Sequence, residues 1–466
     1  MKILLVFAQP SIGAGKRMFN FGIALVSAVL KREGHETSLL NLDVFDANAI
    51  DKSLNSFNPD LICFSCSTDQ IEIVKESASY IKNKEIPMII AGTHATVFPE
   101  DSINVDGIMG ICVGEGEEAI VEFVDALEKG RDYSKIKNFW FKKDGSILRN
   151  DLGPLIQDLD SIPFADRELF DYQDLLTNHK DGYEFMASRG CAYKCTFCIY
   201  PKLQDLYEGK GKFVRYRSVD NVLKEIKEVT GKYKTDFKFI TFHDDIFTYD
   251  RSWLREFCEK YSEEFDIPFR CNVRVDRVDE EMFQLLKKAN CDQIWMGVES
   301  GDEYIRNKIM KKYVKDEQII RAFSLAKKYG IKSMAFTMIG LPYETEEQIK
   351  KTLELNKKLD TEIRGVNVFR PYPGTELYDI SRDNGWISDR EVTGYGDPSI
   401  LDQPSISARK INYYRDIFDP YVTGSKWLPL VRILARIRLR DESLYSFLRR
   451  TRYTLSTKAR SISIAK

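Results

Sequence analysis

The chain has 466 residues, of which 43% are hydrophobic and 30% charged, and its formal net charge is −2. This balance is typical of globular proteins and excludes a largely disordered, collagen-like or disulfide-stapled chain. The length allows several domain cores. No apolar run is long enough to form a membrane-spanning helix, and the N-terminal run MKILLVF is more typical of a buried strand than of a signal peptide. We therefore expect a cytoplasmic protein.

Residues 1–130 alternate strand and helix signals. Continuous apolar runs predict buried parallel strands at 2–7, 61–65, 87–92 and 107–114. Helical spacing of apolar residues predicts helices near 21–30, 69–83 and 115–129. The pattern indicates a doubly wound, Rossmann or flavodoxin-like α/β domain, in which ligands bind at the carboxyl ends of the strands.

The pattern changes twice further along the chain. Residues 131–182 are expected to form a connector, in which a Lys-Asp-Gly turn predicts a hairpin. From 183 to 375, strand signals lie at 184–188, 237–242, 268–273, 292–298, 332–340 and 364–369, with helical segments between them. Six strands and five crossovers predict a partial (β/α)6, TIM-like barrel. Residues 376–466 are expected to be a mostly helical extension.

Three cysteines mark the start of the predicted barrel. Cys191, Cys195 and Cys198 follow its first strand with the spacing C-x3-C-x2-C. Iron–sulfur clusters are held by cysteine thiolates, and a cubane cluster normally takes four. Three thiolates therefore leave one iron open to another ligand, as open metal sites do generally. Chance clustering and a zinc site are the alternatives, but zinc would need a fourth Cys or His nearby, and the sequence has none there.

These cysteines, with Phe197 directly before the third, resemble the radical S-adenosylmethionine (radical SAM) superfamily. Further resembling motifs end later strands, namely FHDDIF (242–247), CNVR (271–274), GVESG (297–301), IGLPYET (339–345) and PYPGTELY (371–378). The resemblance implies a [4Fe–4S] cluster whose open iron binds S-adenosylmethionine, which an electron cleaves to methionine and a 5′-deoxyadenosyl radical. It also implies an electron donor such as flavodoxin or ferredoxin.

The same resemblance assigns three acidic residues to S-adenosylmethionine. Glu299 would contact its polar groups, and Asp244 and Asp245 its methionyl amine. An aspartate pair that caps a helix is an equally good interpretation of the last two. His243, beside them, is a candidate acid or base.

The N-terminal domain resembles the cobalamin-binding domain found in one branch of the superfamily. The resembling segments are FSCST (64–68), AGTHATVFPE (91–100) and VGEGEEAI (113–120). By resemblance, the groove for the cobalamin nucleotide tail is lined by Ser65, Ser67, Gly92 and Thr93 and closed by Gly114, Glu115 and Gly116. The GEGEE run also serves as a plain helix N-terminus.

Two departures weaken this resemblance. The D-x-H-x-x-G loop, whose histidine ligates cobalt in some relatives, is absent after the first strand, and AGTH replaces the usual double glycine. His94 either contacts the corrin or packs within its loop. Cys63, Cys66 and Cys112 invite a second cluster, as in methylthiotransferases, but their spacing favours buried thiols.

The C-terminus is basic. Residues 426–466 carry eleven Lys or Arg against two acidic residues, a balance of +9, so that the rest of the chain is near −11. Residues 427–450 predict a basic amphipathic helix carrying Arg432, Arg436, Arg438 and Arg440. Such a helix is compatible with an anionic membrane surface and equally with docking on the acidic body of the chain.

Together, the motifs predict a cobalamin-dependent radical SAM enzyme. The expected reaction is methylation of an unactivated carbon in a small-molecule or lipid substrate, with no nucleic acid partner. One alternative is a radical SAM oxidative cyclase, rearrangement enzyme or methylthiotransferase that lacks cobalamin. The other is a non-enzymatic iron–sulfur or cobalamin sensor, which is disfavoured because a sensor needs neither the open iron nor the GVES strand.

Overall fold

The computed structural model describes residues 1–9, 17–179, 182–390 and 399–440. The chain divides into two compact units. The first unit contains residues 1–273, 280–294 and 372–379, and the remaining described residues form the second. No helix among the described residues is both long and apolar enough to cross a membrane.

A seven-stranded sheet forms the core of the N-terminal domain. Its strands are β1 (Lys2–Ala8), β2 (Glu36–Leu42), β3 (Leu61–Ser65), β4 (Met88–Ala91), β5 (Gly110–Cys112), β6 (Phe139–Lys143) and β7 (Ser146–Arg149). The spatial order is β2-β1-β3-β4-β5-β6-β7, in which β1 to β5 run parallel and the β6–β7 hairpin is antiparallel. The chain direction across the sheet reverses between β1 and β3, and doubly wound sheets bind ligands at such a switch point.

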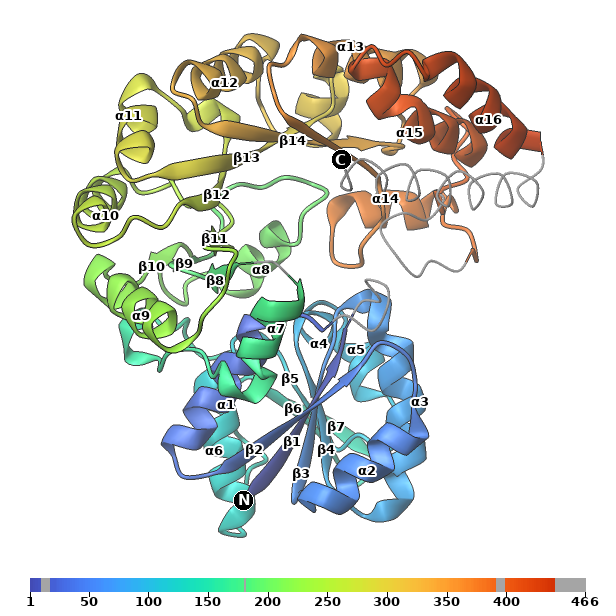
Figure 1. Ribbon diagram of the computed structural model, residues 1–466. Helices are drawn as coiled ribbons and strands as arrows, with labels where there is room; N and C mark the ends of the chain where they lie inside the picture. The colour runs from blue at the N-terminus through green and yellow to red at the C-terminus, as the bar shows by residue number, and fades with distance from the viewer. Residues whose placement is uncertain (10–16, 180–181, 391–398, 441–466) are drawn as a thin grey trace, which may run out of the picture. The chain divides into compact units, whose positions relative to one another are not determined.

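Helices cover both faces of this sheet (Figure 1). Helices α1 (Phe21–Arg32) and α6 (Glu117–Glu128) lie on one face, and α2 (Ala47–Phe57) and α3 (Ile71–Ile81) on the other. The short helices α4 (Thr93–Val97) and α5 (Pro99–Ile103) follow β4. Leu4, Ile62 and Ile90 are buried in the core between sheet and helices. Helix α1 begins where Asn20 caps it by accepting the Ile23 N–H at 3.0 Å.

The rest of the first unit contains a second set of parallel strands. Strands β8 (Tyr183–Phe185), β11 (Ile240–Phe242) and β12 (Phe269–Val273) pair in parallel, and β9 (Ser188–Arg189) pairs antiparallel with β10 (Arg215–Tyr216). The helices here are α7 (Tyr172–His179), α8 (Tyr200–Leu206), α9 (Val219–Lys232), α10 (Arg251–Glu264) and α11 (Glu280–Lys288). Strand β13 (Cys291–Glu299) begins in this unit and ends in the second.

The second unit continues the alternation of strands and helices. Strands β14 (Lys332–Ile339) and β15 (Ile363–Val368) pair in parallel. Its helices are α12 (Asp316–Lys328), α13 (Glu346–Lys358), α15 (Ala408–Val422) and α16 (Leu428–Arg440), and α14 (Glu376–Asp383) begins in the first unit. Short turns of other helix types are η1 (Thr68–Gln70), η2 (Lys82–Lys84), η3 (Leu159–Ser161), η4 (Glu168–Phe170), η5 (Val275–Arg277) and the π-helical η6 (Ile305–Ile309).

Every strand predicted from an apolar run is present, and the predicted α/β architecture is confirmed. Two differences are informative. The 139–149 hairpin extends the first sheet, because β6 pairs with β5, so this part of the expected connector belongs to the N-terminal domain. The predicted basic helix begins at Leu428 and is described as far as Arg440, and its expected continuation to 450 lies outside the described residues.

A buried ion pair joins elements of the first unit. The Arg167 Nη1 lies 2.6 Å from Glu225 Oε1, and the two side chains are 3% and 2% exposed. Arg167 also donates to the Glu184 carbonyl at 2.7 Å, and Arg217 donates to the second oxygen of Glu225. Glu225 therefore neutralises two cations between α9 and β8.

Replacing Glu225 with leucine leaves the Arg167 guanidinium buried without a carboxylate. We expect the free energy of unfolding, measured by urea denaturation, to fall by about 3–5 kcal/mol. The control is Glu281→Leu, which removes an exposed ion pair with Arg255 and should cost about 1 kcal/mol or less. A loss for Glu225→Leu no larger than that of the control would contradict this assignment.

Candidate functional site

One cavity of about 460 Å³ lies at the carboxyl ends of β1, β3, β4 and β5. Six of the seven residues that the sequence predicts for the cobalamin groove line it, namely Ser65, Gly92, Thr93, Gly114, Glu115 and Gly116. The seventh, Ser67, is not among the described lining residues, and its hydroxyl donates to Gln70. The cavity extends between the sheet and α1, where Leu5, Ile23 and Val26 form an apolar wall.

Two glycines in the cavity wall are required by their conformation and surroundings. Gly92 has a φ of +95°, and a Cβ there would lie 2.9 Å from Ser65 Oγ. Gly114 has a φ of +85°, and a Cβ there would lie 1.9 Å from the Tyr207 hydroxyl oxygen. Both glycines are therefore required by packing against the protein itself. The short residues at the strand ends, Ser65, Gly92 and Thr93, leave room in this wall for a bulky ligand such as a corrinoid.

Three thiols of the N-terminal domain are buried. Cys63 and Cys112 line the cavity, and burial raises the pKa of Cys63 and of Cys66 to about 12. Burial also raises the pKa of Cys112. Thiolates are the form that binds metals, so their surroundings agree with the buried-thiol interpretation.

The three motif cysteines lie on one folded loop between β9 and α8. Cys198 N–H donates to the Cys195 carbonyl at 3.1 Å, and Gln204 Nε2 donates to the Cys191 carbonyl at 2.7 Å. Burial, and then the neighbouring Cys195 and Cys191 thiols, raise the pKa of Cys198 to about 12. An iron–sulfur cluster would neutralise such a set of thiolates, so the donor set fits a [4Fe–4S] cluster. Phe197 is partly exposed on the same loop.

Asp244 and Asp245, which follow β11, occupy different surroundings. Asp244 is buried and accepts the Ala187 N–H at 3.1 Å and the Ser188 hydroxyl, so it holds the start of β9. Burial raises its pKa to about 6. Asp245 lines the cavity and shares a hydrogen bond with Tyr200. Asp244 thus holds the backbone at the start of β9, whereas Asp245 faces the cavity, and the contact of either with S-adenosylmethionine stays a prediction.

The two candidate histidines also differ. His243 lines the cavity, its side chain is 42% exposed, and its Nε2 lies 3.9 Å from Glu184 Oε2. His94 has both ring nitrogens partnered, by Thr68 at 3.2 Å and Asp101 at 3.0 Å. Its position agrees with the packing interpretation rather than with a contact to the corrin.

Glu299 ends β13 in the second unit with a φ of +64°. Its Oε1 lies 2.7 Å from the Nζ of Lys312, and both side chains are largely buried. Lys312 has no recognisable sequence signal and was not predicted. In the first unit, the cavity-wall residues Arg189, Tyr207 and Arg215 were not predicted either. Only Arg189 stood near a motif, two residues before Cys191.

Comparison with known proteins finds a family match for each of two segments of the chain. A family model of the B12 binding domain matches residues 12–124, and one of the radical SAM superfamily matches residues 186–355. An uncharacterized methyltransferase of Pyrococcus horikoshii is 30% identical over 401 residues, which cover 83% of this chain and 84% of that protein. An anaerobic magnesium-protoporphyrin IX monomethyl ester cyclase of Rubrivivax gelatinosus is 24% identical over 442 residues, covering 90% of this chain and 77% of that protein.

Two solved structures share the fold. TsrM of Kitasatospora setae, a radical S-adenosylmethionine methyltransferase with cobalamin and a [4Fe–4S] cluster bound, aligns with a TM-score of 0.67 at 17% identity over 87% of this chain and 80% of that one. The cobalamin-dependent radical enzyme OxsB aligns with a TM-score of 0.69 at 18% identity over 96% of this chain and 75% of that one. The chain therefore belongs to the radical SAM enzymes that carry an N-terminal B12-binding domain, and its cofactors are a [4Fe–4S] cluster, S-adenosylmethionine and cobalamin.

Proposed function

We propose that this enzyme methylates an unactivated carbon of a small-molecule or lipid substrate. The observation that supports the proposal best is the composition of the cavity described above. Its wall includes the strand ends of the B12-binding domain and also Arg189, Gly190 and Tyr200, which flank the cysteine loop. When bound, the cluster and S-adenosylmethionine supply a radical that removes a hydrogen atom from carbon, and the corrinoid supplies the methyl group.

The chain itself would hold these groups and shield them from water. Cys191, Cys195 and Cys198 would ligate the cluster, and the short residues Ser65, Gly92 and Thr93 at the strand ends would leave room for the corrinoid. His243 lines the same cavity and would offer a ring nitrogen as a hydrogen-bond partner to a ligand there. Fixing reacting groups in one apolar space is the protein's main contribution to such chemistry.

Relatives favour methyl transfer and leave one second candidate. The Pyrococcus relative is described as a methyltransferase, as is TsrM. The Rubrivivax relative is a cyclase, which favours ring closure as the second candidate. A sensor would bind the cofactors without cleaving S-adenosylmethionine.

Isotopic labelling distinguishes these functions without a known substrate. The full chain, loaded with cobalamin and cluster and reduced without oxygen, is incubated with S-adenosylmethionine labelled in its methyl group. A methyltransferase is expected to form 5′-deoxyadenosine and to place the label on the corrinoid. Deoxyadenosine without corrinoid labelling would contradict methyl transfer and favour the cyclase, and neither product would favour the sensor.

Adding a methyl group at position 114 tests the cobalamin cradle. The new Cβ of Gly114→Ala would meet the Tyr207 hydroxyl, and the positive φ adds strain, so we expect corrinoid content per chain to fall about tenfold or more. Gly130→Ala is the control, because Gly130 also has a positive φ but no atom lies within 4 Å of its added Cβ. Absorbance of the purified holoproteins measures the corrinoid content of both variants. Equal content would contradict a role of the turn at Gly114 in binding cobalamin.

Radical SAM enzymes take an external reductant, and we propose flavodoxin or ferredoxin for this one.

We also propose a cytoplasmic enzyme whose helix α16 contacts an anionic membrane surface. Val431 and Ala435 of α16 are buried in the second unit, whereas Trp427, Leu430 and Ile433 are about half exposed. Exposed apolar residues beside Arg432 and Arg436 fit the interfacial region of an anionic bilayer.

Sedimentation with lipid vesicles tests the membrane contact. The full chain is expected to bind phosphatidylglycerol vesicles, to bind phosphatidylcholine vesicles far less, and to be released by salt. The double variant Trp427→Ser, Ile433→Ser should lose binding, whereas Val44→Ser, an exposed apolar residue elsewhere, should keep it. Equal binding by both variants would exclude this face as the contact.

A further inference from the structure

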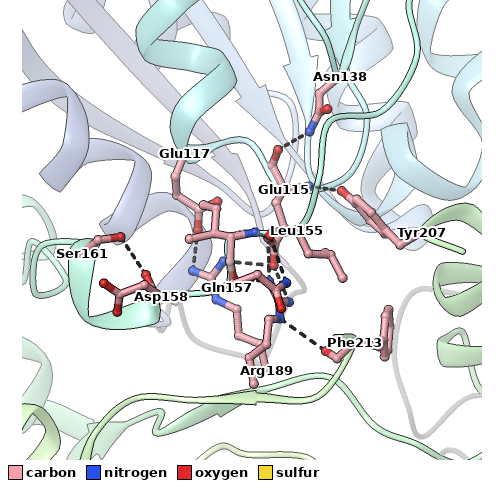
Figure 2. Close-up of polar contacts among 12 residues, drawn as sticks. Glu115, Glu117, Asn138, Leu155, Gln157, Asp158, Ser161, Arg189, Tyr207 and Phe213 are labelled. Carbon is pink, nitrogen blue, oxygen red and sulfur yellow. Dashed lines mark hydrogen bonds and ion pairs between the residues drawn. The ribbon is translucent and has the colours of Figure 1, made fainter. Parts of the chain in front are cut away.

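Four charged side chains form a compact group in the wall of the cavity. We call Glu115, Glu117, Arg189 and Arg215 the charge quartet. Arg215 binds both carboxylate oxygens of Glu115, at 2.9 and 2.7 Å, and Arg189 Nη1 lies 3.3 Å from Glu115 Oε1. Arg189 also donates to Glu117. Figure 2 shows the Arg189 side chain pointing toward the two glutamates.

The quartet joins segments that are far apart in the chain. Glu115 and Glu117 belong to the turn that leads from β5 into α6 and forms the last wall of the corrinoid groove. Arg189 ends β9, two residues before Cys191, and Arg215 lies opposite it on β10. The Glu115 carboxylate is therefore bound by two arginines. Arg189 lies on the strand that directly precedes the cysteine loop, and Arg215 lies on the strand that pairs with it.

A second link connects the same turn to the other side of the cysteine loop. The Glu115 N–H donates to the Tyr207 hydroxyl at 2.7 Å, and Tyr207 follows the last residue of α8, the helix that begins after Cys198. Asn138 Nδ2 donates to the Glu115 carbonyl at 2.6 Å (Figure 2), and Glu115 Oε2 accepts the Ile156 N–H at 3.1 Å. Both the backbone and the side chain of Glu115 are thus fixed.

Stability alone is a poor explanation for this arrangement. The four side chains are only 5–17% exposed. Burial raises the pKa of Glu115, but Arg215 and Arg189 outweigh this effect and lower it, so the group is charged. Buried ion pairs are often no more stabilising than apolar residues of similar volume, whereas their directional bonds fix one geometry.

We propose that the charge quartet consists of positioning residues that set the separation between the corrinoid and the iron–sulfur cluster. The inference rests on the proposed function, since it requires both cofactors to be used in one cavity. The turn at 114–117 would contact the corrinoid. The ion pairs of the quartet, with the Glu115–Tyr207 hydrogen bond, would then fix both ends of the cysteine loop relative to that turn.

Pulsed electron paramagnetic resonance measures this separation directly. The full chain is prepared with cob(II)alamin and reduced cluster, both paramagnetic, and the distribution of distances between them is recorded. Arg189→Met, which removes the link between the two glutamates, is expected to broaden the distribution and shift its maximum by about 1 Å or more, a displacement large enough to impair catalysis. The exchanged pair Arg189→Glu, Glu117→Arg should restore part of the narrow distribution.

Controls keep the result decisive. Glu225→Gln weakens a buried ion pair outside this cavity, so it should lower stability and leave the distance unchanged. If Arg189→Met does not retain both cofactors, Glu117→Gln, which keeps both arginines and Glu115, is measured in its place. An unchanged distribution in the measured variant would overturn the positioning role. Failure of the wild-type chain to bind a corrinoid would instead overturn the proposed function.

Discussion

A bulky ligand can be enclosed at the end of a parallel sheet only if the backbone there carries few side chains. In this protein short residues line that edge, and Gly92 and Gly114, both with a positive φ, pack there against Ser65 and Tyr207. The turn at Gly114 cannot move independently, because the Tyr207 hydroxyl also accepts the next N–H, that of Glu115. This turn and the segment that follows the cysteine loop are therefore parts of one packed structure.

Most charges in the cavity wall are paired. Glu115 and Glu117 form ion pairs with Arg189 and Arg215, whereas Asp245 and His243 also line the cavity. Much of the remaining wall is apolar, with Leu5, Ile23 and Met186 among its residues. Paired charges of this kind would leave the charges of bound cofactors to dominate the local field.

Local patterns made much of this protein predictable from its sequence. The cysteine loop depends on spacing within eight residues, and the buried strands depend on continuous apolar runs, so the sequence alone predicts both. Strand β2 was missed because its sequence, ETSLLNL, mixes polar and apolar residues at the edge of the sheet. The 139–149 hairpin was recognised, but its pairing with β5 depends on tertiary contacts that no local pattern reveals.

The residues that contact Glu115 were not predictable. Tyr207 and Arg215 lie 92 and 100 positions from Glu115 in the chain, and no spacing rule relates them. Lys312 reaches Glu299 in the same way, through the fold of the second unit. Local chemistry thus indicated which cofactors to expect, whereas these side-chain contacts follow only from the three-dimensional packing.

The central claim is that one chain holds an iron–sulfur cluster and a corrinoid together. The most direct test is to purify the full chain without oxygen after expression with cobalamin, and to measure iron, sulfide and corrinoid per chain. The account predicts about four irons with matching sulfide and about one corrinoid, and loss of the iron alone in Cys198→Ala. A chain that acquires its cluster but no corrinoid, even with cobalamin in excess, would contradict it.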